Sequence, residues 1–177
     1  MTARRMTLSA PSRPTQPVVS VVSLADLGPA GEAAIVRLCS EALGTDCGSL
    51  FGFLSASTHV LANLDGLLVG HACWTTRQLK PSGVPALRTA WVDAVTVAPA
   101  HQRRGVGSMV MRRVEELTAD FELRALGTER MSFFEQLGWR RWHGPTVHVL
   151  HDPLDTLMIL RTASSPELDL TEQISAT

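Results

Sequence analysis

The fold is decided by residues 90–108, which have the sequence AWVDAVTVAPAHQRRGVGS. The first part of this stretch is rich in β-branched residues and is halted by Pro99, so it predicts a β-strand over residues 89–98. The last part leads into residues 106–119, where apolar side chains recur at helical spacing and predict an α-helix. A glycine-bearing turn therefore connects a strand to a helix.

This turn has the composition of an anion-binding site. Gly105 and Gly107 have no side chains to keep a phosphate from the backbone, and the first amides of the helix lack intrahelical partners. Together with the positive end of the helix dipole, these amides predict a cradle for a pyrophosphate. An ordinary helix start would use the same residues, and the stretch matches neither a Walker loop nor the full G-x-G-x-x-G dinucleotide fingerprint.

The rest of the chain predicts two further helices and several short strands. Residues 59–63 and 67–76 flank the turn signal Leu64-Asp65-Gly66 and predict an antiparallel hairpin. The other predicted elements are a strand at 18–24, a helix that has Pro29 in its first turn and ends before Gly44, a loop at 80–85, a strand at 122–126, a helix at 131–137, and strands at 139–142, 147–150 and 156–160. This order predicts an α/β domain, of the α+β kind, with a mixed central sheet and helices on its faces.

The domain is predicted to span residues 18–161. Residues 1–17 contain three prolines and few apolar side chains, so they predict a disordered N-terminal arm. Residues 162–177 are polar and acidic and predict a C-terminal tail that is either loose or a flap facing the substrate. The length of 177 residues suits one domain.

Composition narrows the classes of function. The formal net charge of −1 lacks the basic excess of nucleic-acid-binding proteins. The three cysteines have neither disulfide-framework nor zinc-ligand spacing, and no apolar run reaches the roughly 18 residues that a membrane span needs. We therefore expect a cytoplasmic protein without a metal site, a nucleic-acid partner or a membrane partner.

Residues 102–107, QRRGVG, match the Q/R-x-x-G-x-G/A motif, and the chain thereby resembles the GNAT superfamily of N-acetyltransferases from about residue 18 to residue 160. Within that superfamily it is similar to the aminoglycoside 2'-N-acetyltransferases. The segments that carry this closer likeness are RTAWVDAVTV (88–97), LRAL (123–126) with FFEQLGW (133–139), and WRRWHGPT (139–146). The resemblance implies the GNAT fold, with a mixed and mostly antiparallel sheet, and acetyl-CoA as co-substrate.

The resemblance also implies direct transfer of the acetyl group to a substrate amine, with positioning and proton handling as the main catalytic effects. The Val95 and Val97 amides match the positions that bind the pantetheine arm and polarise the thioester oxygen. The residues that the resemblance assigns to acetyl-CoA are Val95, Val97, Gln102, Arg103, Arg104, Gly105, Val106, Gly107, Ser108, Thr128 and Phe134.

Two positions bear on proton transfer. Asp93 matches the family's glutamate base, although the alternative is a plain edge residue of the strand. Phe134 stands where the family has a tyrosine acid, and the chain contains no tyrosine at all. Either the CoA thiolate leaves unaided or through water, or Ser132 or Thr128 acts instead, or activity is reduced.

The acceptor is the remaining question. A polycationic aminoglycoside needs several carboxylates, and the residues predicted to bind the acceptor are Asp46, Asp93, Trp142, Asp152 and Asp155. For Trp142 the alternative is a core position. The alternatives are acetylation of another small amine, a non-catalytic acyl-CoA-binding module, and an amine-sequestering protein. Analogy with the family implies a homodimer.

Overall fold

The structure is a computed structural model that describes residues 16–49, 57–150, 152 and 155–176. Residues 1–15 of the predicted N-terminal arm lie outside this range. The elements in chain order are β1 (Val18–Ser23), α1 (Leu24–Leu43), β2 (Thr58–Leu64), β3 (Leu67–Pro81), β4 (Leu87–Val97), the 3₁₀ turn η1 (Pro99–His101), α3 (Val106–Leu117), β5 (Leu123–Thr128), α4 (Met131–Glu135), β6 (Arg140–Arg141), β7 (Thr146–Val147), β8 (Thr156–Arg161) and β9 (Ile174–Ala176).

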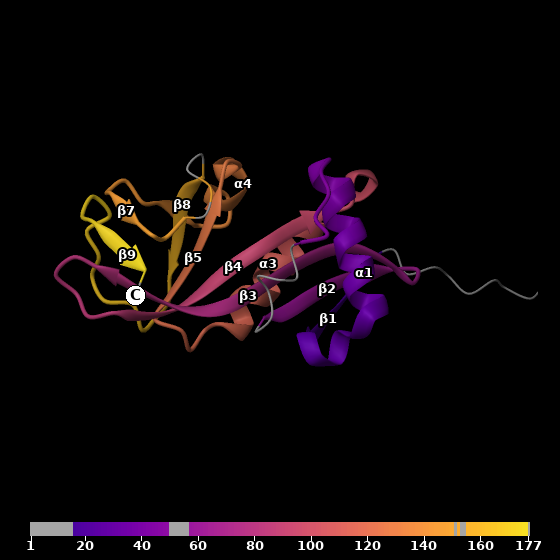
Figure 1. Cartoon of the computed structure of the whole chain (residues 1–177), viewed down its shortest axis with the longest axis horizontal. Helices are drawn as coiled ribbons and strands as arrows, with labels where there is room; N and C mark the ends of the chain where they lie inside the picture. Colours follow the sequence, from indigo (N-terminus) through magenta and orange to yellow (C-terminus); the bar gives the residue numbers. More distant parts are fainter. Residues whose placement is uncertain (1–15, 50–56, 151, 153–154, 177) are drawn as a thin grey trace, which may run out of the picture.

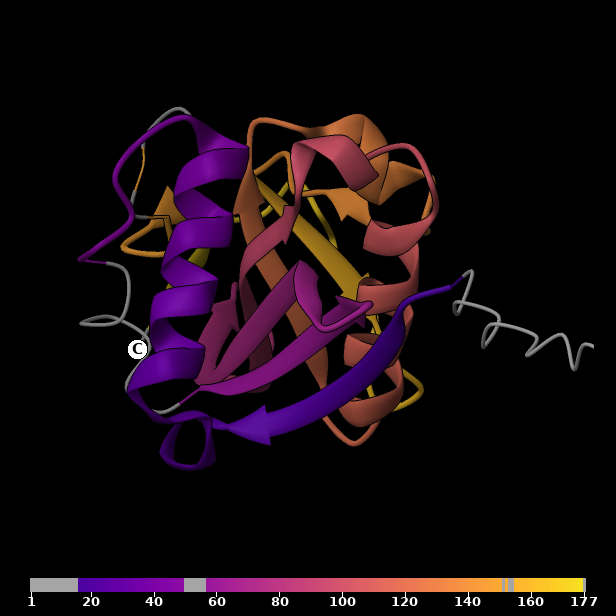
Figure 2. The ribbon, with the colours of Figure 1, turned by 90° about the vertical axis from the view of Figure 1, so that its right-hand side faces the viewer.

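In the described residues, the strands form one nine-stranded sheet in the order β1-β2-β3-β4-β5-β8-β6, with β9 paired to β3 and β7 paired to β9. The β4–β5 and β7–β9 ladders are parallel and the others are antiparallel. Figure 2 shows α1 on one face of the sheet and α3 on the other. The prediction of a mixed, mostly antiparallel sheet with helices on both faces is confirmed.

Local sequence signals account for the boundaries of the first elements. In the β2–β3 hairpin, Asp65 (φ 51°) and Gly66 (φ 80°) both adopt the left-handed conformation that a tight two-residue turn requires. Helix α1 begins earlier than predicted, at Leu24, because the Ser23 hydroxyl accepts a hydrogen bond from the Asp26 amide and caps the helix. The helix is kinked at Gly28 before Pro29, which explains why the sequence predicts only the part beyond it.

Strand β4 pairs with its parallel neighbour β5 over a short length. The paired residues are Thr89 with Leu123, Ala90 with Arg124, and Trp91 with Ala125. Beyond Trp91 the ladder stops, although β4 continues to Val97 and β5 to Thr128. The ladder with β5 therefore stops short of the last six residues of β4, 92–97.

A β-bulge lies in the same part of β4. Thr96 pairs with His71 and Asp93 pairs with Cys73, so Ala94 and Val95 together face the single residue Ala72. Ala94 has a φ of 52°, in the left-handed region that non-glycine residues disfavour. The bulge resets the alternation of side chains and puts Asp93 and Thr96 on the same face, although they are three residues apart.

Helix α3 is held at both ends. At its start, Val106 packs so closely against β3 that a side chain at Gly70 would lie 2.7 Å from the Val106 Cγ1 atom. At its end, the guanidinium of Arg124, which is 6% exposed, donates to Thr118 Oγ1 at 2.7 Å and to the carbonyl of Glu115 at 2.6 Å. Burial lowers the pKa of Arg124, and Glu115 partly opposes this. These contacts hold α3 against β3 at its start and β5 at its end.

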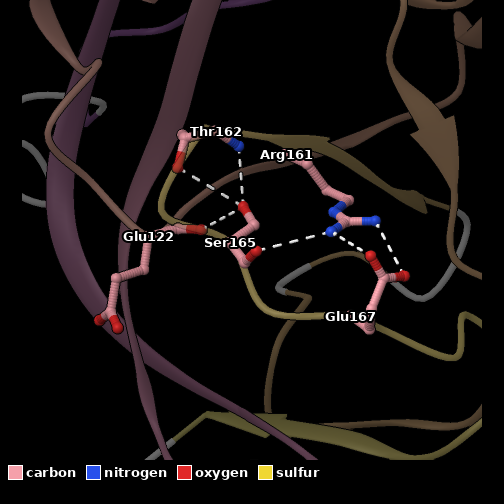
Figure 3. Close-up of polar contacts among 5 residues, drawn as sticks. All are labelled: Glu122, Arg161, Thr162, Ser165 and Glu167. Carbon is pink, nitrogen blue, oxygen red and sulfur yellow. Dashed lines mark hydrogen bonds and ion pairs between the residues drawn. The ribbon is translucent and has the colours of Figure 1, made fainter.

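The C-terminal segment differs from the expectation of a loose tail, because it is joined to the sheet at both ends. At its start, the Thr162 hydroxyl donates to the Phe121 carbonyl at 2.6 Å, the Ser165 hydroxyl donates to the Glu122 carbonyl, and Arg161 binds the Glu167 carboxylate, as Figure 3 shows for the last two contacts. At its end, β9 pairs with β3 over residues 79–81, at the left-hand end of the molecule in Figure 1.

Apolar residues inside this polar segment are the physical reason. Leu168 and Leu170 are half-buried and Ile174 is fully buried, in a core cluster that also contains Trp91 and Trp142. The pairing with β9 also extends β3 to Pro81, into residues predicted to be a loop. Strand β7 is shorter than predicted and ends at Val147, because His148 has a φ of 56° and breaks the extended backbone.

Candidate functional site

The turn between β4 and α3 has the backbone of an anion cradle. Arg103 (φ 61°) and Gly105 (φ 81°) are both left-handed, and α3 begins directly after Gly105. No atom lies within 4 Å of the place where a Gly105 side chain would stand. The side chain of Gln102 donates to the Val97 carbonyl at 3.1 Å, so it ties the turn to the end of β4. The first amides of α3, which have no acceptor within the helix, begin directly after this turn, at the positive end of the helix dipole.

Gly107 has a different constraint. A Cβ atom there would lie 3.1 Å from the Phe133 Cζ atom and 3.5 Å from the Val97 Cγ2 atom. The glycine therefore lets the phenyl ring of α4 lie directly against the first turn of α3. Phe133 was missed at the sequence level, because the spacing FF in residues 133–134 does not tell which ring faces the turn.

A groove of about 530 Å³ continues from the turn along the outer side of α3. It is lined by Val19, Gly105, Ser108, Met109, Arg112, Arg113 and Glu116. Arg113 is already paired with Glu116 at 2.8 Å, whereas Arg103 and Arg104 are exposed side chains of the turn. Positive charge therefore surrounds the predicted phosphate position, and the buried Val106 anchors the helix beneath it.

Asp93 lies on β4 immediately before the bulge, with 31% of its side chain exposed. Its Oδ2 atom is 3.9 Å from an Arg77 nitrogen, and the Arg77 guanidinium stacks on the Trp91 ring at 4.2 Å. Burial lowers the pKa of Arg77, and Asp93 partly opposes this. Arg77 is a neighbour of Asp93 that the sequence does not reveal, because the antiparallel register of β3 and β4 brings the two together.

Asp155 belongs to the same neighbourhood. Its carboxylate covers Gly127 of β5, where a Cβ atom would lie 2.9 Å from Asp155 Oδ2. The pKa of Asp155 is raised, chiefly because burial disfavours its charged form and further because Asp152, Glu129 and Asp93 repel it. Three of the four carboxylates predicted to bind an acceptor are thus close enough to interact, and Glu129 adds a fourth that the sequence analysis missed.

The other predicted site residues lie apart from these carboxylates. Asp46 is exposed in the loop after α1, accepts a hydrogen bond from the Gly48 amide at 2.8 Å, and is not among the carboxylates that act on Asp155. Trp142 is 4% exposed, and its indole nitrogen donates to the Glu172 carbonyl at 2.9 Å, so its ring belongs to the core. The Thr128 hydroxyl accepts from the Arg130 amide at 2.9 Å, just before α4.

Phe134 is 5% exposed and packs in the main core cluster. Its ring makes edge-on contacts with Phe133, at 5.0 Å between centroids, and with Trp139, at 5.9 Å. Ser132, the nearest hydroxyl on the same helix, is exposed. The contact of Phe134 with the co-substrate stays a prediction.

The family assignment comes from comparison with known proteins. The model of the acetyltransferase (GNAT) family matches residues 36–139, which is more than half of the chain. The chain belongs to the GNAT family. This confirms the predicted membership of an acetyltransferase family. No curated protein sequence matches the chain significantly.

Solved structures of GNAT proteins share the fold. The GNAT N-acetyltransferase YhbS from Escherichia coli, in complex with CoA, has a TM-score of 0.71 at 11% identity, covering 97% of this chain and 94% of that one. A GNAT acetyltransferase from Brucella melitensis, in complex with acetyl-CoA, has a TM-score of 0.59 at 15% identity, with 89% and 94% covered. A GCN5-related N-acetyltransferase from Kribbella flavida has a TM-score of 0.58 at 21% identity; 73% of this chain is covered, and this chain spans about a third (34%) of that protein.

These comparisons confirm the predicted GNAT fold. They carry no information about the acceptor, because their low identity shows the fold alone. Among the described residues, no helix combines the length and the apolar character that crossing a bilayer requires.

Proposed function

We propose that this chain transfers the acetyl group of acetyl-CoA to a primary amine of a small cationic molecule, by direct attack of the amine and without a covalent enzyme intermediate. The observation that carries the proposal is the position of Asp93. Its carboxylate lies on the strand that ends at the phosphate turn, next to the bulge, and it interacts with Asp155 in a group of acidic side chains. The co-substrate turn and the acidic group are therefore linked by a single strand, β4.

The residues of the turn fit acetyl-CoA. The open backbone at Gly105 and the first amides of α3 suit the pyrophosphate, and Arg103 and Arg104 supply positive charge beside it. Val97 lies beyond the end of the β4–β5 ladder, and its amide would bind the pantetheine arm. When bound, acetyl-CoA supplies the activated acetyl group.

Two groups of the chain then act on the reaction. The Val95 N–H donates to the thioester oxygen and stabilises the negative charge that develops there during attack. Asp93 holds the ammonium form of the acceptor and takes the proton from the amine, directly or through water. Asp155, Asp152 and Glu129 favour a cation electrostatically, so they concentrate an acceptor that carries more than one positive charge.

The acceptor is proposed to be either the 2'-amine of an aminoglycoside or an amine of another small polycation. The acidic group supports both, since each is a cation, and Asp46 lies outside that group. Release of CoA thiol, measured with an aminoglycoside panel and with linear polyamines, separates the two. Turnover of linear polyamines alone would rule out the aminoglycoside.

The site is tested by two substitutions. Gly107→Glu adds a negative charge and a side chain where the Phe133 ring is 3.1 Å away, so it should weaken acetyl-CoA binding at least about ten-fold, measured by calorimetry. Asp93→Asn keeps the size but removes the basic group, so kcat/KM should fall by about 10²-fold and its pH dependence should change. An unchanged pH profile in the asparagine variant would reduce Asp93 to a structural residue.

A non-catalytic acyl-CoA-binding module is the second candidate, because Phe134 puts a ring without a hydroxyl where a proton donor is expected. In that case acetyl-CoA binds and Gly107→Glu abolishes binding, but no amine releases the thiol. Analogy with the family also supports the proposal of a homodimer in the cytoplasm. Light scattering of the purified chain measures the oligomeric state.

A further inference from the structure

A row of buried hydrogen bonds ends on the β4 bulge from the face that α1 covers. Ser57 Oγ lies 2.7 Å from His59 Nε2, His59 Nδ1 lies 2.9 Å from His71 Nε2, and His71 Nδ1 lies 3.0 Å from the carbonyl oxygen of Ala94. Both imidazoles are 0% exposed. Buried polar groups of this kind are retained only when their partners are in place.

The chemistry of the end groups fixes the direction of every bond in the row. The Ala94 oxygen can only accept, so the hydrogen of His71 is on Nδ1. Burial, and then the neighbouring His59, lower the pKa of His71 to about 3, so this ring is neutral and its Nε2 accepts from the Nδ1–H of His59. Burial also lowers the pKa of His59, so its Nε2 accepts from the Ser57 hydroxyl. All three hydrogen bonds therefore point toward Ala94.

A metal ion is a poorer account of the same cluster. The ligand atoms of His59, His71 and Cys73 lie within 4.8 Å of one another. Two nitrogens on a tetrahedral zinc ion are about 3.3 Å apart, given a bond of roughly 2.0–2.1 Å, whereas the two imidazole nitrogens are 2.9 Å apart, at hydrogen-bond distance. The Cys73 thiol donates to the Asp93 carbonyl at 3.5 Å, and burial raises its pKa well above the ordinary value, so it stays protonated.

The row acts on a backbone conformation that needs support. Ala94 is left-handed, and such a residue persists only where its surroundings hold it. Its carbonyl accepts from His71 Nδ1 and, at 3.3 Å, from the Thr96 hydroxyl, while Cys73 holds the carbonyl of the preceding Asp93. These side chains fix the two carbonyls at the start of the bulge.

The consequence for Val95 follows from the geometry of one peptide unit. The Ala94 carbonyl and the Val95 N–H belong to the same planar, trans peptide, and in such a unit the N–H points opposite to the C=O. Directing the Ala94 oxygen toward His71 therefore also directs the Val95 N–H away from it.

We infer that the Ser57-His59-His71 row is a positioning device for acetyl transfer, which aims the Val95 amide by holding the carbonyl of Ala94. The inference rests on the proposed function, because the direction of that amide matters for catalysis only if it polarises the thioester oxygen. His71 touches neither substrate in this account. It acts through the peptide that it holds.

The test compares two substitutions of His71 in the full chain. His71→Leu leaves the Ala94 oxygen with only the longer hydrogen bond from the Thr96 hydroxyl, whereas His71→Gln supplies an amide that can donate to Ala94 and accept from His59. Losing an oxyanion donor outright costs roughly 10²–10³-fold in kcat, so misdirecting it through His71→Leu should cost about ten-fold or more. The KM for acetyl-CoA should change less than about two-fold, and His71→Gln should restore most of kcat.

Infrared spectra of bound [1-¹³C]acetyl-CoA give a second readout that needs no acceptor. The carbonyl stretch should lie at lower frequency in the wild type and in His71→Gln than in His71→Leu. Leu79→Ala is the matched control, because Leu79 is equally buried on β3 but pairs with Leu87 and Ala176, far from the bulge. A folded His71→Leu protein with wild-type kcat and carbonyl stretch would overturn the inference, as would an equal loss of kcat in Leu79→Ala.

Nitrogen-15 spectra of the imidazoles distinguish failure of the row from failure of the proposed function. They report the Nδ1–H tautomers of His59 and His71 whether or not the protein turns over. Any other tautomer pattern refutes the row itself. The expected tautomers in a protein that acetylates no amine count instead against the proposed function on which the inference rests.

Discussion

Gly144 is the position where a single methyl group should do the most damage to this fold. An ideal Cβ atom there would lie 1.9 Å from the carbonyl oxygen of Glu172 and 2.5 Å from that of Thr171, both of which are backbone atoms of the C-terminal segment. A rotamer change cannot relieve this clash. Gly144→Ala must therefore push the C-terminal segment away from the sheet by about 1 Å or more.

The cost can be worked out from the contacts that cross this boundary. Four hydrogen bonds join the two sides. The Gly144 amide donates to the Leu170 carbonyl, the Trp142 indole to the Glu172 carbonyl and the Ile174 amide to the Pro145 carbonyl, each at 2.9 Å, and the His143 amide donates to the Leu170 carbonyl at 2.7 Å. At about 1 kcal/mol each, their loss lowers the free energy of unfolding by about 4 kcal/mol. For a chain of this size that corresponds to a fall in Tm of about 8–16 °C.

Thermal unfolding followed by tryptophan fluorescence measures this change, because Trp142 lies in the affected contact. Glu172→Ala is the matched control, since it removes an exposed side chain and keeps the backbone oxygen that Gly144 meets. Limited proteolysis should cut the C-terminal segment faster in Gly144→Ala alone. A Gly144→Ala protein with the Tm and protease resistance of the wild type would refute the reasoning.

Three further changes have expected outcomes. Arg124→Leu should lower stability by about 2–3 kcal/mol in urea unfolding, because it leaves the buried acceptors at the end of α3 without their charged donor, and a loss below about 0.5 kcal/mol would contradict this. Asp155→Asn should raise Tm at pH 7 but not at pH 3. The raised pKa means that the carboxyl binds its proton more tightly in the folded protein than in the unfolded chain, so the stability of the wild type falls as pH rises past the ordinary pKa of 3.8. A gain in Tm that is independent of pH would argue against this. Phe134→Tyr should raise kcat by up to about 10²-fold if chemistry limits turnover, with a larger solvent isotope effect, and an unchanged rate beside a strong wild-type isotope effect would assign the acid to another group.

Features with short-range causes were predictable from the sequence. The hairpin follows from Asp65-Gly66, and the start of α3 follows from Gly105 and the apolar spacing after it. The GNAT family followed from the same six residues, 102–107, that form the turn. In each case, residues close in sequence determine the backbone on their own.

Features that depend on contacts between residues far apart in the sequence were not predictable from it. The bulge at Ala94 depends on His71, which is 23 residues away, and nothing in the string DAVTV indicates a left-handed alanine. The C-terminal segment is predicted from its polar and acidic composition to be a loose tail or a flap. Its three apolar residues that pack on the core, Leu168, Leu170 and Ile174, are too few to change that composition. The same docking explains why Trp142, for which the sequence leaves open a core position or a place in the acceptor pocket, lies in the core.

The short ladder between β4 and β5 has a mechanical consequence. Among the described residues, the three pairs of the β4–β5 ladder are the only strand pairing between β1–β4 and the β5-β8-β6 half of the sheet, so we expect this ladder to open more readily than the longer ones. A pantetheine arm hydrogen-bonded along residues 92–97 would continue the contacts of β4 beyond this short ladder and would connect the two halves of the sheet. Binding of acetyl-CoA would then reduce the local opening fluctuations of the sheet. Amide hydrogens of β5 and β8 would exchange more slowly with solvent, even where they contact no ligand.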